Sequence, residues 1–212
     1  GRWTMRYFNK DLVSDQRQLN SERLKRRRPH YEKTVKPADL QSHLDDGWKI
    51  VRENRDSYRI SKAKPIGEKL EDRTWNLFLS LGFEKLSSGA DFRVRLKAGS
   101  SERMKQVDVL ATDGEFTFVV ECKASESNSV NVGRALNDFE ADKQKYTKAL
   151  KEELTDCGKP VFLVVVNKDI RPVDRKRADQ LRCNNIYVWT SKELSYIEKL
   201  VSHAGHLSRR QL

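Results

Sequence analysis

Hydrophobic positions after residue 65 follow two distinct periods along the chain. Apolar residues three or four positions apart predict amphipathic helices, whereas short runs of apolar and β-branched residues predict strands. In chain order the predicted elements are a helix at 68–81, a strand at 92–96, a hairpin at 106–123, a helix at 131–154, a strand at 160–166, a helix at 174–182, a strand at 186–189 and a helix at 191–204. Because the run at 160–166 is apolar on both faces, the alternation indicates a mixed α/β sheet with helices on both sides.

The first 64 residues carry weaker patterns. Apolar positions are only loosely periodic at the start, and the basic run Lys25-Arg26-Arg27-Arg28-Pro29 predicts an exposed linker. Two short apolar runs around Asn54-Arg55-Asp56 predict a small hairpin, and Pro65 to Gly67 break the chain before the main domain. We therefore divide the chain into a basic N-terminal arm (1–36), a small accessory segment (37–64) and a main domain (65–212).

Charge adds a candidate partner to this picture. The net charge is +11 and the isoelectric point is about 9.6. Residues 1–36 contain eleven Lys or Arg against four Asp or Glu, so +7 of the +11 lies there. Such an excess favours a polyanion, although a solvated charge run is the alternative interpretation of the arm. The candidate phosphate-binding residues are Lys25, Arg26, Arg27, Arg28, Arg171, Arg175, Lys176 and Arg177.

Cysteine usage and hydropathy limit the compartment. Cys122, Cys157 and Cys183 are isolated and odd in number, which argues against a disulfide framework or a structural zinc site. No apolar stretch approaches the length of a membrane span, and no secretory signal opens the chain. We expect a cytoplasmic protein without a membrane partner.

The hairpin at 106–123 places charged residues on one face. If Asp113-Gly114 form a two-residue loop, Asp108 lies opposite Val119. Glu121 and Lys123 follow two and four residues farther along the second strand. Because side chains alternate between faces, Asp108, Glu121 and Lys123 then project from the same side of the sheet. A bulge or an odd-length loop would turn Asp108 to the other face.

An aspartate and a glutamate on one face form a hard oxygen site suited to Mg²⁺ or Mn²⁺. Such a metal lowers the pKa of a bound water and neutralises charge on a phosphodiester. Lys123, on the same face as Glu121, can position the water or stabilise developing charge. The alternative is a surface hairpin in which Asp108 or Glu121 forms an ordinary cross-strand pair with Lys123.

Asp108 followed by Glu121-x-Lys123 at the end of an apolar strand resembles the motif of the PD-(D/E)xK nuclease superfamily. The resemblance covers roughly residues 65–190 and implies the restriction-endonuclease-like fold, an αβββαβ core with a mixed sheet flanked by helices. The spacing from Glu71 to Gly82-Phe83 resembles that of Mrr-like and Holliday-junction-resolvase-like members. One departure is Val107, where the superfamily often has proline.

The resemblance also implies site residues on the two flanking helices. Glu71 corresponds to the glutamate that many members place on the preceding helix, with Glu68 one turn earlier as the alternative. Gln144-Lys145-Tyr146 resembles the glutamine and aromatic that follow the motif, which adds Gln144. The implied catalytic set is Glu71, Asp108, Glu121, Lys123 and Gln144, and the implied Mg²⁺ or Mn²⁺ ligands are Asp108, Glu121 and Glu71.

The activity implied by the resemblance is hydrolysis of duplex or branched DNA, in restriction or anti-phage defence. Two alternatives remain open: an RNA substrate, and a module on the same fold that binds nucleic acid or protein without cleaving. A homodimer is one expected assembly, because many nucleases of this type dimerise. The sequence is also similar to nuclease-like regions that precede DGQHR-type domains, so the chain can be one part of a longer polypeptide or defence complex.

Overall fold

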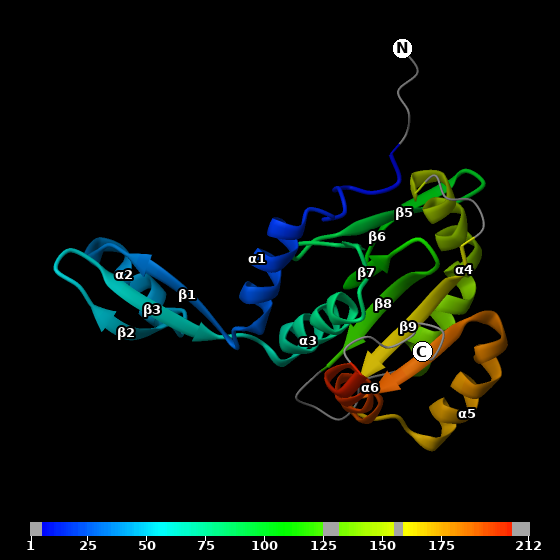
Figure 1. Cartoon of the computed structure of the whole chain (residues 1–212). Coiled ribbons are helices and arrows are strands. Elements are labelled where there is room, and N and C mark those ends of the chain that lie inside the picture. Colours follow the sequence, from blue (N-terminus) through cyan, green and yellow to red (C-terminus); the bar gives the residue numbers. More distant parts are fainter. Residues whose placement is uncertain (1–5, 125–131, 155–158, 205–212) are drawn as a thin grey trace, which may run out of the picture.

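A five-stranded mixed sheet forms the centre of the main body (Figure 1). The computed structural model describes residues 6–124, 132–154 and 159–204. The strands, in their order across the sheet, are β10 (Ile186–Thr190), β9 (Val161–Asn167), β8 (Thr117–Lys123), β7 (Val109–Thr112) and β4 (Lys85–Leu86). β8, β9 and β10 are parallel, and β7 runs antiparallel to both of its neighbours. The predicted mixed α/β class is confirmed.

Helices cover both faces of this sheet. They are α3 (Ile66–Ser80) and α6 (Ser191–Ala204) on one face, and α4 (Val132–Leu154) and α5 (Pro172–Leu181) on the other. A short 3-10 turn, η1 (Arg182–Asn184), links α5 to β10. Alternate strand residues divide between the two cores: Val119 and Leu163 face α4, whereas Val120 and Val164 face α3. β9 is thus buried on both faces, as its apolar run predicts.

No helix within residues 6–124, 132–154 and 159–204 is suited to span a membrane. None of them combines the length and the apolarity that a bilayer crossing requires.

A second hairpin precedes the central one. β5 (Arg93–Ala98) and β6 (Ser101–Gln106) pair antiparallel beside α4. Val94 and Leu96 enter the core, which confirms the strand predicted at 92–96. The sequence analysis missed β6, because its only large apolar residue, Met104, is partly exposed and gives no alternating pattern.

The β7–β8 loop has four residues, not the predicted two. Thr112 pairs with Thr117, so residues 113–116 form the turn. The Asp113 carboxylate accepts hydrogen bonds from the backbone N–H groups of Glu115 (2.6 Å) and Phe116 (2.8 Å). This side-chain cap stabilises the longer turn, which the Asp-Gly pair alone did not indicate.

The longer loop moves the register by two residues and preserves its parity. Val109 pairs with Val120, so Asp108, one residue before Val109, lies level with Glu121 instead of Val119. The shift is even, so it does not change which strand residues share a face; Asp108 itself lies in a bend just before β7.

The N-terminal residues are not a free arm. Phe8 and Val13 form β-bridges with Val94 and Leu86, respectively. Helix α1 (Gln16–Arg27) begins at the Asp15 cap and packs on α3, where Leu19 is buried. The described part of the predicted basic arm is therefore attached to the body through the apolar residues Phe8, Val13 and Leu19.

A small antiparallel sheet projects from the main body (Figure 1). Its elements are β1 (His30–Val35), α2 (Pro37–Asp45), β2 (Lys49–Glu53) and β3 (Tyr58–Ala63), with the strand order β1-β3-β2. We call residues 30–63 the small sheet unit. It contains the predicted hairpin as β2 and β3, but the predicted boundary at residue 36 divides it, since β1 pairs with β3.

Candidate active site

The candidate site lies where β8 ends against α3. A Cβ atom on Gly67, in the first turn of α3, would lie 3.7 Å from the carbonyl oxygen of Ala124, which follows β8. Two turns farther along α3, Thr74 Oγ1 lies 3.7 Å from Cys122 Sγ. α3 therefore runs beside the last residues of β8. The carboxyl edge of parallel strands is where α/β proteins commonly bind ligands.

Glu71 and Asp108 form a pair of carboxyl groups at this edge. Asp108 Oδ2 accepts a hydrogen bond from the Cys122 backbone N–H (2.7 Å), which fixes its direction. Burial raises the pKa of Asp108, and the charge of Glu121 raises it further. Burial and the neighbouring charge of Asp108 raise the pKa of Glu71 to about 7. The Glu71 and Asp108 side chains are also hydrogen-bonded to each other, so the pair retains a proton near neutral pH.

Glu68, the alternative to Glu71, has a different environment. Burial and the charge of Asp72 raise its pKa, whereas Asp108 has no part in the shift. The structure thus pairs Glu71, and not Glu68, with Asp108.

Glu121 and Lys123 complete the group on the sheet side. Lys123 Nζ lies 2.7 Å from Glu121 Oε1, and both side chains are partly exposed. Glu121 and Lys123 share the α4 face of β8, whereas Asp108 lies in the bend before β7, beside Glu71 of α3, so the predicted common face of all three stays a prediction. Glu121 is therefore paired with the positive charge of Lys123, whereas Asp108 accepts a hydrogen bond from the Cys122 backbone N–H.

Tyr146 on α4 lies near this acidic group, and the sequence analysis named it as the aromatic that follows the motif. It is almost fully buried, and burial together with the charges of Glu121 and Asp142 raises the pKa of its hydroxyl. The phenol therefore stays protonated and is a neutral donor beside the carboxylates.

Gln144 is not brought to the site. It is exposed on α4, whereas Asp142 and Tyr146, two residues to either side, are buried. Two helical residues correspond to a rotation of about 200°, so Gln144 points away from the side that faces the sheet. The catalytic role implied for Gln144 therefore stays a prediction, which its exposed position does not support.

The donor set fits a hard divalent cation, although its present arrangement is not that of a metal centre. Across the part of the chain that the structure describes, no three His, Cys, Asp or Glu side chains converge as a ready-made metal site. The charge of Asp108 nevertheless raises the pKa of Glu71, and the charge of Glu121 raises that of Asp108, so a cation among these carboxylates would relieve their repulsion. Glu121 can join them as an oxygen ligand once it exchanges Lys123 for the cation.

The predicted phosphate-binding residues of the first basic run divide into two classes. Arg26 is engaged in the interior: it bonds Asp72 at 3.0 Å and Glu22 at 3.0 Å. Lys25, Arg27 and Arg28 are exposed. The prediction of an exposed run is therefore wrong for Arg26, because the buried carboxylate of Asp72 requires a positive partner.

The second basic segment is largely neutralised within the domain. Arg171 pairs with Asp174, Arg175 with Glu193 and Arg177 with Glu140. Lys176 is exposed, and no ion pair involves it among the described residues. Three of these four cations would have to exchange an acidic partner in order to bind phosphate.

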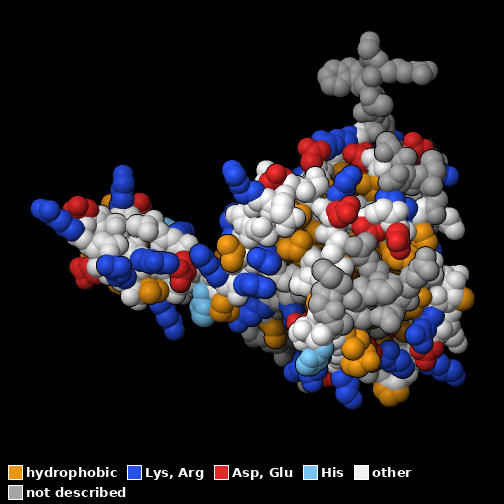
Figure 2. All heavy atoms as spheres, in the orientation of Figure 1, with side chains coloured by type: hydrophobic (Ala, Val, Ile, Leu, Met, Phe, Trp, Pro, Cys, Tyr) orange, Lys and Arg blue, Asp and Glu red, His pale blue; other side chains and the backbone are white. Residues whose placement is uncertain are grey.

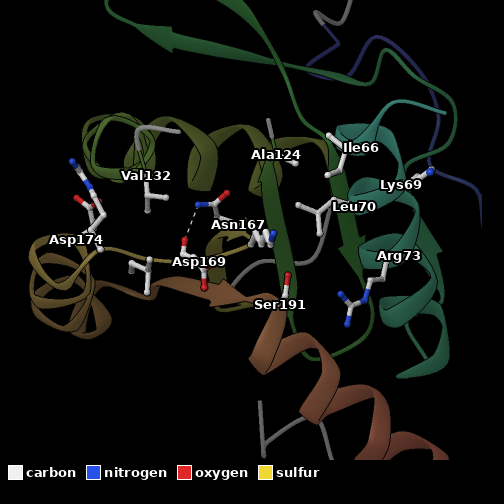
Figure 3. Close-up of a pocket in the computed structure, with 13 residues that line it drawn as sticks. Ile66, Lys69, Leu70, Arg73, Ala124, Val132, Asn167, Asp169, Asp174 and Ser191 are labelled. Carbon is white, nitrogen blue, oxygen red and sulfur yellow. Dashed lines mark hydrogen bonds and ion pairs between the residues drawn. The ribbon is translucent and has the colours of Figure 1, made fainter. Parts of the chain in front are cut away.

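Two hollows adjoin the acidic group. A groove of about 590 Å³, here called the Glu71 groove, lies between α1, β1 and α3; among its lining residues are Lys25, Arg28, His30, Glu32, Glu68 and Glu71. A second pocket of about 420 Å³ lies at the carboxyl edge of β8, β9 and β10 (Figure 3). There Asn167 Nδ2 donates a hydrogen bond to the carbonyl oxygen of Asp169 (2.7 Å), and Arg73 points from α3 toward Ser191.

Comparison with known proteins yields little. No family model matches the chain, and no curated protein matches it. Among solved structures, protein VC1899 from Vibrio cholerae is similar over 89% of this chain, with 16% sequence identity and a TM-score of 0.43. The match covers 50% of that protein, so the chain spans about half of its length. A TM-score this low gives no basis for transferring fold or function.

Proposed function

We propose that this chain is a divalent-metal-dependent endonuclease of the restriction-endonuclease-like type that hydrolyses DNA. The observation that carries the proposal is the hydrogen-bonded pair Glu71–Asp108 next to Glu121 and Lys123 at the carboxyl edge of β8. Groups with strongly shifted pKa values cluster at functional sites, and Glu71, whose pKa is raised to about 7, also lines a groove.

The proposed roles follow from the surroundings of each side chain. Asp108, Glu121 and Glu71 would hold Mg²⁺ or Mn²⁺. The bound cation would supply Lewis-acid chemistry, lowering the pKa of water and neutralising charge on the phosphodiester. The Cys122 N–H keeps Asp108 aimed in one direction. Lys123, released from Glu121, would orient the attacking water or stabilise charge on the phosphate oxygens.

The order of elements supports the proposal. α3 precedes the antiparallel strands that lead into β8, and α4 then crosses to the parallel strand β9. This succession agrees with the αβββαβ core that the sequence motif implies. The expected role in restriction or phage defence rests on the resemblance alone.

One observation favours the non-cleaving alternative. Lys123 occupies Glu121 at 2.7 Å, and no three-ligand group is formed among the described residues. A module that only binds nucleic acid or protein would need no exchange of this ion pair. No observation favours RNA over DNA as the substrate, and the cleavage assay distinguishes the two.

The test is a cleavage assay on plasmid, single-stranded DNA and RNA, with Mg²⁺ or Mn²⁺ and with EDTA. Wild type should cut DNA only with metal, and Asp108→Asn should not cut. Asp138→Asn is the matched control, because Asp138 is an exposed carboxylate on α4. Cleavage by Asp108→Asn at the wild-type rate would refute the proposal, and so would cleavage restricted to RNA. If wild type and Asp108→Asn bind DNA equally well and neither cleaves it, the chain is a non-cleaving binding module.

A further inference from the structure

The small sheet unit has two chemically different faces. On one face Ile60 is fully buried, and Lys62, which shares it, bonds Asp46 at the end of α2 (3.2 Å). Lys33, level with Ile60, lies 4.3 Å above the Trp48 ring. These contacts show that α2 and Trp48 cover this face. Because side chains alternate along each strand, the residues between these positions project from the opposite face.

The opposite face is polar and predominantly basic. By register its charged and polar residues include His30, Glu32 and Thr34 from β1, Lys49 and Arg52 from β2, and Arg59 from β3. All six residues are exposed. We call this surface the open face. Glu32 is its single carboxylate among the described residues, and it pairs with Arg59.

Two cations lie directly opposite each other on this open face. Arg52 pairs with Arg59 across the β2–β3 ladder. Like charges directly opposite destabilise an antiparallel pair, and within the described part of the chain neither Lys49 nor Arg52 forms an ion pair. A polyanion on the open face would remove this repulsion.

The dimensions and composition of the open face favour duplex DNA over other nucleic acids. Three strands about 4.8 Å apart span about 10 Å between the outer strands, and the major groove of B-DNA is about 12 Å wide. The major groove of A-form RNA is too narrow to admit such an element. Single strands are commonly bound by stacking on aromatic rings. The rings of Tyr31 and Trp48 lie on the α2 side instead.

The open face is continuous with the candidate active site. His30 and Glu32 from β1 line the Glu71 groove together with Glu71 itself. Lys25 and Arg28 line the same groove at the junction between the unit and the body. Figure 2 shows Lys and Arg side chains along the unit and at that junction. DNA bound to the open face would therefore have its backbone directed toward the carboxylates.

We infer that the open face binds duplex DNA and presents the strand to the Glu71 groove. The first half concerns binding alone, and the second rests on the proposed nuclease function. Lys49, Arg52 and Arg59 bind backbone phosphates, and Glu32 is displaced from Arg59 when the phosphate enters.

The experiment measures affinity for a labelled duplex by fluorescence anisotropy in EDTA over a range of salt concentrations. The variant is Lys49→Ala/Arg52→Ala in the full chain. Its control is Lys148→Ala/Lys151→Ala, which removes the same charge from exposed positions on α4; Lys151 lies by the amino ends of β8 and β9. Losing two phosphate contacts should lower affinity by about 10-fold or more at low salt and reduce the slope of log K against log salt by about 2. Lys49→Gln/Arg52→Gln, which keeps long polar side chains, should give the same result.

Equal weakening by the α4 control would overturn the inference, because net charge alone would then explain binding. Tighter binding of RNA or single-stranded DNA than of the duplex would also overturn it. Metal-dependent cleavage is scored separately on the same proteins. If wild type cuts DNA but the face variants bind normally, the inference fails and the nuclease proposal stands. If the face variants lose binding while wild type never cuts, the nuclease proposal fails and the binding surface stands.

Discussion

Lys64 Nζ lies 2.8 Å from Asp72 Oδ2 in a buried ion pair. Arg26 approaches the other carboxylate oxygen of Asp72 at 3.0 Å and also lies over the Trp75 ring. Because Glu71 directly precedes Asp72, this interior network fixes the turn of α3 that presents Glu71 to Asp108. Asp72 is thus surrounded by positive side chains, whereas its neighbour Glu71 faces the carboxyl group of Asp108.

Replacing Asp72 by alanine should strongly destabilise the fold. The change leaves Lys64 and Arg26 buried without a negative partner, a loss of about 3–5 kcal/mol for a broken interior pair. Urea unfolding followed by circular dichroism measures it. Asp138→Ala, at an exposed position, should change the unfolding free energy by about 0.5 kcal/mol or less. A comparable loss in both variants would contradict the structural role of Asp72.

Metal binding should release protons near neutral pH. The pKa of Glu71 is raised to about 7 by burial and Asp108, so this carboxyl must deprotonate to become a ligand. Titration calorimetry with Mn²⁺ in two buffers of different ionisation enthalpy should show release of about half a proton from Glu71 at pH 7. Affinity should rise from pH 6 to pH 8. Glu71→Gln should lose the proton release, and an unchanged release would show that Glu71 is not a ligand.

The stability of the metal-free protein should fall as pH rises through the same range. Folded Glu71 binds its proton with a pKa of about 7, whereas in the unfolded chain it titrates near 4.5. Between these values the folded state binds more protons, so this group lowers the free energy of unfolding as pH increases. Glu71→Gln should therefore be more stable than wild type at pH 8 and nearly equal to it at pH 4.5. Thermal unfolding in EDTA at both pH values checks the sign, and Gln144→Ala serves as the exposed control.

Lys123→Ala should reduce cleavage without weakening DNA binding. If Lys123 acts on the water or the phosphate charge, its loss should lower the rate by about 100- to 1000-fold. Single-turnover cleavage with Mn²⁺ and anisotropy in EDTA separate the two effects. Lys151→Ala, at an exposed position on α4, controls for the lost charge. Parallel losses of binding and cleavage would assign Lys123 to the phosphate backbone instead.

Gln144→Ala should cleave DNA within about twofold of wild type, because the Gln144 side chain is exposed on the outer side of α4. Tyr146→Phe removes the buried hydroxyl beside Glu121 and should reduce the rate more. Cleavage rates at saturating Mn²⁺ compare them. A larger loss with Gln144→Ala would show that α4 rotates when DNA binds.

Local patterns predicted the sheet and its helices well. The buried strand at 161–167 and the α3 stripe follow from hydrophobic spacing alone. The predicted register of the central hairpin was wrong by two residues, because its loop has four residues, and the shift brings Asp108 level with Glu121 instead of Val119. The pairing of Glu71 with Asp108 depends on how α3 packs against the sheet, and no local sequence pattern specifies that packing.

Other features depend on contacts distant in the chain. Arg26 has the sequence environment of an exposed linker, yet Asp72, far along the chain, draws it into the interior. Within the small sheet unit the β2–β3 hairpin was predicted, but β1 was missed because it pairs with β3 across the intervening α2 and β2. Pairing of that kind is set by tertiary packing, and a window of neighbouring residues does not contain it.

The chain leaves the body and returns to it at adjacent points. The Lys64 backbone N–H donates to the Pro29 carbonyl oxygen at 3.0 Å, so the two ends of residues 30–63 meet. The Lys64 Nζ atom also donates a hydrogen bond to the Lys25 carbonyl oxygen (3.1 Å), on the body side of this junction. The small sheet unit is thus an inserted cassette: a short glycine link from 29 to 64 could replace it while the clamp around Asp72 stays intact. Evolution or an engineer could in this way exchange the recognition element of the protein without redesigning its acidic centre.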